Sequence, residues 1–108
     1  MKLTLPRPVE DYFAADRRGA PAVVACFTDR AVVTDESRVW VGHDAIRQWK
    51  ESTTSRYRYT SKPIASEEKD GTITVVSRLT GDFPGSPADL RYVFVLDGDK
   101  ISSLEIKP

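Results

Sequence analysis

The sequence predicts an α+β fold in which three helices precede most of a bent antiparallel sheet. Apolar residues recur at helical spacing in three segments between Pro8 and Ser52, each with a proline or glycine near an expected helix end. From Arg56 onward the period changes to two, and β-branched residues become frequent. Helices and strands that are segregated along the chain favour α+β over an alternating α/β architecture.

The three helices are expected at Pro8–Arg18, Pro21–Cys26 and His43–Ser52. Proline fits the first turn of the first two helices, and Gly19 supplies a C-terminal stop for the first. Three apolar residues of the third helix share one face, namely Ala45, Ile46 and Trp49. Each helix therefore has an apolar side that can cover a sheet.

Two short strands and a meander of four long strands are expected. The short strands, Ala31–Asp35 and Val39–Val41, precede the third helix. In the first long strand, which begins at Arg56, Tyr57 and Tyr59 share a face. Glycine-containing turns join the first long strand to the second and the third to the fourth. The later strands are expected at Thr72–Thr80, Leu90–Leu96 and Lys100–Ile106.

Two irregularities predict that this sheet is bent. Pro63 marks an edge or a kink in the first long strand, because proline cannot donate to the ladder. In the last strand Ile101 is out of phase with Leu104 and Ile106, which a β-bulge explains. A bent sheet with helices across its concave side encloses a cone with one open mouth. Such a cone is suited to hold a small molecule.

Composition narrows the range of partners. Lysine plus arginine and aspartate plus glutamate both total 16 and are interleaved, so we expect no nucleic-acid or membrane partner. Seven charged residues are spread over the first twenty positions, which predicts a cytoplasmic protein without a signal peptide. The length fits a single domain over residues 1–108. We expect Cys26 to be a small buried apolar residue. His43 is the only histidine, and no cysteine cluster completes a set of metal ligands with it, so neither metal nor cofactor is expected.

Three stretches carry a resemblance to a known family: "YFAADRRGAPAVVACFTDRAVVTDE", "GHDAIRQW" and "LRYVFVLDGDKISSLEI". Their spacing resembles the nuclear transport factor 2-like superfamily, with its SnoaL-like branch as the nearest fit. The resemblance covers Val9 to Ile106 and implies a cone that is usually part of a homodimer. It does not choose an activity, because the superfamily includes ketosteroid isomerases, polyketide cyclases, epoxide hydrolases, dehydratases and non-catalytic transport factors.

Two residues match positions that are catalytic in the isomerases of this superfamily. Asp35 falls on the general base, because "FTDRAVVTD" aligns without gaps, and Tyr12 falls on the tyrosine that donates a hydrogen bond to the enolate. Trp49 falls on an aromatic pocket residue. Those isomerases add a second, protonated aspartic acid. Here its place falls on Arg91 or Tyr92, so the resemblance to that mechanism is incomplete.

Each catalytic candidate also has a structural interpretation. Asp35 and Glu36 could be the solvated end of a strand, whereas the apolar run before Asp35 and the nearby Trp40 favour a desolvated carboxyl group in a pocket. Tyr12 could be a core tyrosine whose hydroxyl finds a backbone partner. Both alternatives stay open at the level of sequence.

Further side chains are expected to contact a ligand. Arg78 is either an outward charge on its strand or an inward anchor for an anionic group. The epoxide hydrolases of the superfamily place an aspartate two residues after such an arginine, and this chain has Thr80 there. The aromatic residues expected to bind a ligand are Phe27, Trp40, Trp49, Tyr59, Tyr92 and Phe94.

Two functions follow from these residues. The first is an isomerase, cyclase or hydrolase that acts on a small apolar or carbonyl-bearing metabolite, with Asp35 as general base and Tyr12 as oxyanion donor. The second is a non-catalytic dimeric module that binds a ligand or a partner. The missing second carboxylate favours the second function, and an inward Asp35 with a raised pKa favours the first.

Overall fold

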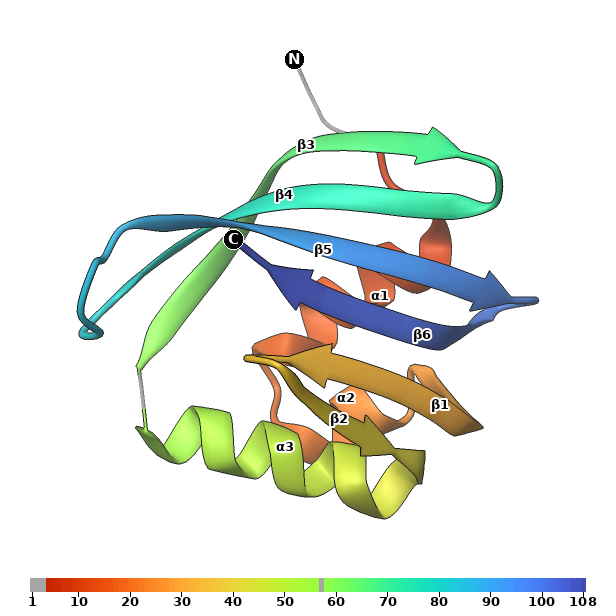
Figure 1. Ribbon diagram of the computed structural model, residues 1–108, viewed down its shortest axis with the longest axis horizontal. Helices are drawn as coiled ribbons and strands as arrows, with labels where there is room; N and C mark the ends of the chain where they lie inside the picture. The colour runs from red at the N-terminus through yellow and green to blue at the C-terminus, as the bar shows by residue number, and fades with distance from the viewer. Residues whose placement is uncertain (1–3, 57) are drawn as a thin grey trace.

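The computed structural model describes residues 4–56 and 58–108, which form three helices and six strands (Figure 1). Tyr57, which the sequence places in the first long strand, lies outside the described residues. No helix in the described part of the chain is long and apolar enough to cross a lipid bilayer. The elements are α1 (Arg7–Asp16), α2 (Ala20–Val24), β1 (Phe27–Asp35), β2 (Arg38–Val41), α3 (Gly42–Arg56), β3 (Tyr59–Lys69), β4 (Thr72–Gly81), β5 (Ala88–Asp97) and β6 (Lys100–Lys107).

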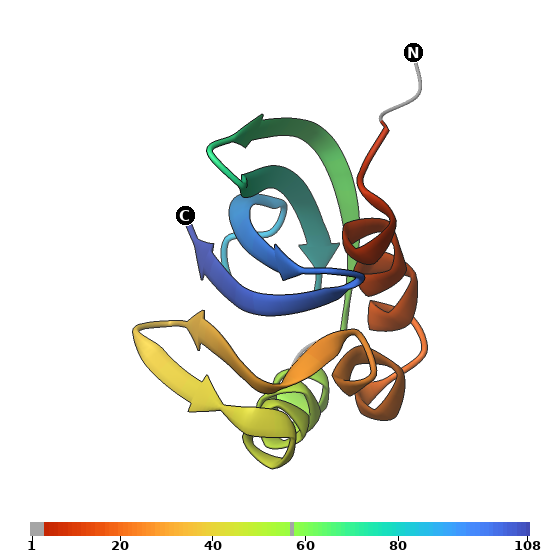
Figure 2. The same ribbon diagram turned by 90° about the vertical axis from the view of Figure 1, so that its right-hand side faces the viewer.

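The strands form one mixed sheet in the order β2-β1-β6-β5-β4-β3. All neighbouring pairs are antiparallel except β1 and β6, which run parallel. The sheet is strongly bent, and the helices lie on one side of it (Figure 2). Helix α3 packs mainly against β1 and α2, and it also contacts β2. The α+β architecture predicted from the sequence, with a mainly antiparallel sheet, is confirmed.

Both predicted irregularities are present. Between the pairs Val95↔Ser103 and Leu96↔Ile101, β6 advances by one residue more than β5, so Ser102 is the extra residue of a bulge. Strand β3 is an edge strand, and its register with β4 shifts immediately after Pro63. A proline at this place removes no ladder hydrogen bond from a central strand.

Three predicted boundaries are wrong. Strand β1 begins at Phe27 rather than Ala31, because Phe27 already pairs with Ile101 of the distant β6. Helix α3 continues to Arg56 instead of ending at Ser52. In this last part of the helix, the hydroxyl of Thr53 donates to the carbonyl oxygen of Trp49, four residues earlier, at 2.9 Å. The first long strand consequently starts at Tyr59 and not at Arg56.

The core fills the cone between the helices and the inner face of the sheet. Four rings from α1 and β5 pack together with centroid separations between 5.2 and 6.3 Å. These rings belong to Tyr12, Phe13, Tyr92 and Phe94. All four rings are buried and fill the narrow part of the cone. Tyr12 and Tyr92 also form the floor of a cavity beside them.

Candidate functional site

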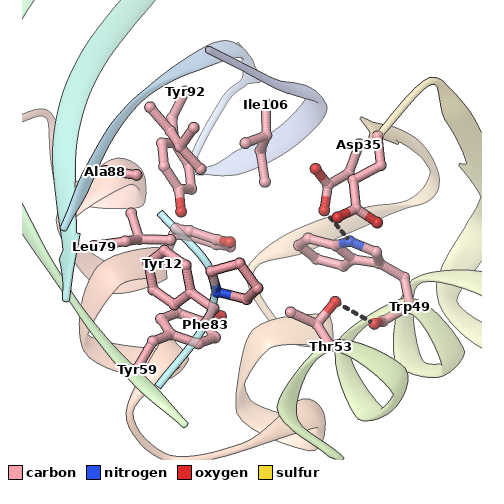
Figure 3. Close-up of a pocket in the computed structure, with 13 residues that line it drawn as sticks. Tyr12, Asp35, Trp49, Thr53, Tyr59, Leu79, Phe83, Ala88, Tyr92 and Ile106 are labelled. Carbon is pink, nitrogen blue, oxygen red and sulfur yellow. Dashed lines mark hydrogen bonds between the residues drawn. The ribbon is translucent and has the colours of Figure 1, made fainter. Parts of the chain in front are cut away.

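A cavity of about 330 Å³ lies at the open side of the cone (Figure 3). Every wall of the cone contributes to it, including the loop between β4 and β5. Its surface is mainly apolar, with a few polar side chains, as is typical of small-molecule sites. The lining residues are Tyr12, Asp35, Glu36, Trp49, Thr53, Tyr59, Leu79, Phe83, Pro84, Ala88, Leu90, Tyr92 and Ile106.

Strand alternation places Asp35 at this cavity. Ala31 and Val33 are fully buried on the inner face of β1, and Asp35 follows at the same period of two. It is the last residue of β1 and pairs with Arg38 across a two-residue hairpin turn. Both turn residues, Glu36 and Ser37, have positive φ, of 52° and 63°. A turn of this kind matches the twist of the two strands and fixes where β1 ends.

The Asp35 carboxylate is held by a neutral donor. The indole N–H of Trp49 donates to Asp35 Oδ2 at 2.9 Å. Among the described residues no salt bridge reaches this carboxylate. Burial raises the pKa of Asp35, the neighbouring Glu36 charge adds to the rise, and the Trp49 hydrogen bond opposes it. The carboxylate is therefore oriented without being neutralised.

Three phenols from other elements line the same cavity as Asp35. Tyr12 on α1, Tyr59 on β3 and Tyr92 on β5 all line the cavity. Burial is the largest cause that raises the pKa of each phenol. All three consequently keep their protons at neutral pH and can donate hydrogen bonds to a ligand. Among the described residues, none forms a hydrogen bond with the Tyr12 hydroxyl.

Behind Tyr59 lies a buried ion pair that sequence reasoning missed. The Lys50 side chain is 1% exposed, and its ammonium group binds the Asp16 carboxylate and donates to the Tyr59 hydroxyl oxygen at 2.6 Å. A signal was available in the sequence. Lys50 follows Ile46 by four residues on α3, and Asp16 follows Tyr12 by four on α1, so both continue apolar helical faces. Charged residues in such positions indicate a buried pair.

Three predicted ligand contacts lie elsewhere. Phe27 and Phe94 are core residues, 2% and 0% exposed, and stand behind the cavity wall. Arg78 does not face the cavity, because β4 turns Ser77 and Leu79 inward and Arg78 outward. There its guanidinium Nε binds Asp89 at 2.9 Å on the exposed surface. Of the two placements that the sequence leaves open for Arg78, the structure has the outward one, so the expected ligand contact of Arg78 is not made at this cavity, whereas Tyr59, Tyr92 and Trp49 do line it.

Trp40 borders a second, smaller cavity of about 140 Å³ on the other side of Asp35 and Trp49. The Arg38 guanidinium lies 4.6 Å from the Trp40 ring centroid. His43 is remote from both cavities, and its Nε2 lies 2.9 Å from the Phe27 carbonyl oxygen. In residues 4–56 and 58–108, no cluster of three or more histidine, cysteine or acidic side chains could hold a metal ion.

A bent six-stranded sheet with three helices on one side and a cavity at the open end defines a class of protein, the nuclear transport factor 2-like fold. Solved structures of that class superpose over nearly the whole chain. A candidate polyketide cyclase from Sinorhizobium meliloti is 34% identical, with a TM-score of 0.91 and 95% of each chain covered. The chain belongs to the nuclear transport factor 2-like superfamily, in its SnoaL-like branch.

More distant structures share the fold. A ketosteroid isomerase-like protein from Catenulispora acidiphila, solved with trimethylamine, is 18% identical, with a TM-score of 0.84 and with 97% of this chain and 87% of that chain covered. The epoxide hydrolase/cyclase-like enzyme SalBIII, which has a role in pyran ring formation in the polyether salinomycin, is 21% identical. Its TM-score is 0.78, and 93% of this chain and 86% of that chain are covered. No protein-family model and no curated protein sequence matches the chain.

Proposed function

We propose that this protein binds a small apolar, carbonyl-bearing or cyclic metabolite in the larger cavity and moves a proton with Asp35. The observation that carries the proposal is the Asp35 carboxylate, which lines an apolar cavity and is oriented by the Trp49 indole at 2.9 Å. The polyketide cyclase-like and isomerase-like relatives support the same chemical class. The reaction is an isomerisation, cyclisation or hydrolysis that begins with proton abstraction.

In the proposed reaction, one side of the cavity abstracts a proton and another stabilises the negative charge that develops. Asp35 takes a proton from a carbon or a water next to the ligand, and its raised pKa makes it a stronger base than an exposed aspartate. The Tyr12 hydroxyl donates a hydrogen bond to the oxygen on which negative charge develops. A positioned base contributes about 10²- to 10⁴-fold. An oxyanion donor contributes about 10²- to 10³-fold.

Hydrogen–deuterium exchange tests this proposal without knowledge of the product. A panel of apolar cyclic ketones is incubated with the protein in deuterated water, and deuterium at the carbon beside the carbonyl is measured by NMR. We expect catalysed exchange of at least one ketone with the native protein and none above background with Asp35→Asn. Asp29→Asn is the matched control, since Asp29 lies on the same strand with a 99% exposed side chain. Equal exchange by Asp35→Asn would contradict the proposal.

The second candidate function is a ligand-binding module without turnover. The observation that favours it is the site of the missing second acid, where β5 carries the exposed Arg91 and the buried Tyr92 in place of a carboxylate. Asp35 is then a structural acid that orders Trp49. Saturable binding of the same ketones with no exchange in any of them identifies this function.

We also propose a homodimer that forms through the outer face of the sheet. Supporting it, Val76, Val93 and Val95 lie on the face that points away from the core, and Val95 is 38% exposed. A bent sheet that is covered on one side leaves such a face available to a second copy. Light scattering at micromolar concentration should give about twice the monomer mass, and a clean monomer contradicts the dimer.

The composition supports proposals for the partner of the protein and for its cellular compartment. The equal numbers of basic and acidic residues support a small molecule as partner, rather than nucleic acid or an anionic membrane. Cys26 is a free, half-buried thiol, as is common in the reducing cytoplasm, where we place the protein. Localisation of a fluorescent fusion tests this placement.

A further inference from the structure

The proposed reaction does not use the most deeply buried charges of the molecule. The side chains of Lys50 and Asp16 are 1% and 9% exposed. Removal of two charges from water costs several kcal/mol per ion, and well-packed apolar residues often serve a fold equally well. The pair is therefore weak evidence of a purely structural role and suggests a role at the cavity that it adjoins.

Lys50 contacts both sides of that cavity. Its ammonium nitrogen lies 5.7 Å from the ring centroid of Trp49, which holds the base, and 5.2 Å from that of Tyr59. It also donates to the Tyr59 hydroxyl oxygen at 2.6 Å. Asp16, the last residue of α1, binds the same ammonium group and so restricts the orientation of the Lys50 side chain. The cation is thus fixed against Tyr59 by residues from two helices.

This contact decides what the Tyr59 hydroxyl can do. An ammonium group only donates hydrogen bonds, so the phenolic oxygen accepts, and the phenolic proton is left for another acceptor. Within residues 4–56 and 58–108, no side chain or carbonyl takes that proton. Tyr59 lines the cavity, so this proton is available to a molecule bound there. A hydroxyl that accepts from a cation is also a stronger donor, because hydrogen bonds in series polarise one another.

We propose that Lys50 is a positioning residue that directs the Tyr59 hydroxyl to donate a hydrogen bond to an anionic or enol-like oxygen of the ligand. This inference rests on the proposed function and adds to it a second donor beside Tyr12. It also names the ligand class more closely, as a flat apolar compound whose oxygen gains negative charge during the reaction. The phenol supplies the second donor that the absent carboxylic acid would have provided.

The test uses 2-naphthol and naphthalene as probes, in the Asp35→Asn protein so that the base does not repel an anion. Absorbance separates bound naphtholate from bound naphthol, and naphthalene reports whether the cavity still accepts an apolar ring. The variants are Tyr59→Phe and the double change Asp16→Asn with Lys50→Met, which removes both buried charges together. The control is Lys62→Met, because Lys62 is exposed on the same strand as Tyr59.

We expect both test variants to lower the affinity for naphtholate by about tenfold or more, the size usual for hydrogen bonds to charged groups. Naphthalene affinity and the Lys62→Met control should stay unchanged. Unchanged naphtholate affinity in Tyr59→Phe, with naphthalene still bound, overturns the role of Lys50 and leaves the proposed function intact. Failure of the unsubstituted Asp35→Asn protein to bind naphthalene overturns both. If the double variant does not fold, Tyr59→Phe alone decides, because it retains the ion pair.

Discussion

Asp16 and Asp35 are two acids removed from bulk water at the same cavity region, and the molecule treats them in opposite ways. Asp16 ends α1 and binds the buried ammonium of Lys50. Asp35 ends β1, and its carboxylate accepts a hydrogen bond from the neutral indole N–H of Trp49. The first acid is compensated by a cation and the second is left with its charge available. The difference shows that the partner, and not burial alone, decides whether a partly buried acid in this protein is compensated by a counter-charge.

The largest effect should come from removing the cation of the first acid. Lys50→Met leaves the Asp16 carboxylate buried without a counter-charge, and we expect the free energy of unfolding to fall by about 3–5 kcal/mol. Urea unfolding followed by circular dichroism measures it. Adding Asp16→Asn should recover most of the loss. A double variant as unstable as the single one would show that packing of the lysine stem, and not charge, sets the stability here.

The next effect concerns the backbone that carries Tyr59. A Cβ atom at Gly81 would lie 2.1 Å from the Arg58 carbonyl oxygen and 2.7 Å from the Tyr59 Cα atom. Gly81→Ala must therefore push β3 away, and overpacking of this kind costs about 1–3 kcal/mol. The same urea experiment checks it, with Thr80→Ala on the exposed side of β4 as the control that should change little. Equal stability of the two variants contradicts the close approach.

The Asp35→Asn variant should reverse the sign seen for the first acid. Burial raises the pKa of Asp35, so ionisation weakens the native protein as the pH rises from the ordinary value of about 3.9 through the raised one. Asparagine still accepts from Trp49 and carries no charge. The variant should therefore melt at the same or a higher temperature than the native protein at pH 7, and this advantage should vanish in acid. The melting temperature of Asp35→Asn minus that of the native protein is compared at the two pH values. A lower difference at pH 7 than at pH 4 refutes the raised pKa of Asp35.

The smallest effect lies in the turn that ends β1. Ser37 has a φ of 63°. This backbone conformation is strained for a residue with a Cβ atom and is unstrained for glycine. Ser37→Gly should raise the free energy of unfolding by roughly 0.5–1 kcal/mol. Ser37→Ala is the comparison, because it removes the hydroxyl and retains the Cβ atom. Stabilisation of equal size by alanine rules out the backbone explanation.

Local sequence patterns predicted much of this architecture. The period of two predicted the strand that carries Tyr92, and the phase slip at Ile101 predicted the bulge in β6. The parallel pairing of β1 with β6 was not predicted, since no local pattern reports contacts between segments so far apart. It moved the start of β1 to Phe27.

The site was harder to predict than the fold. Asp35 and Tyr12 do line one cavity, but their catalytic roles stay predictions. The sequence leaves Arg78 either outward or inward, because strand alternation alone does not say which face of a strand is the inner one; the structure directs it outward. Lys50 and Asp16 were overlooked because charged residues are expected on the surface. Phe83 belongs to a loop, where no periodicity shows which side chains turn inward.

The parallel pair of β1 and β6 also bears on how the protein folds. Residues 27–35 must find residues 101–106, so the strand that carries Asp35 gains its central neighbour only after a very long stretch of chain has been ordered between them. Pairings of such high contact order slow folding, because the entropy of loop closure is lost before the contact forms. On the ribosome, Asp35 and its neighbour across the ladder, Ile106, can meet only after β6 has emerged. The cavity is thus among the last parts of the molecule to assemble.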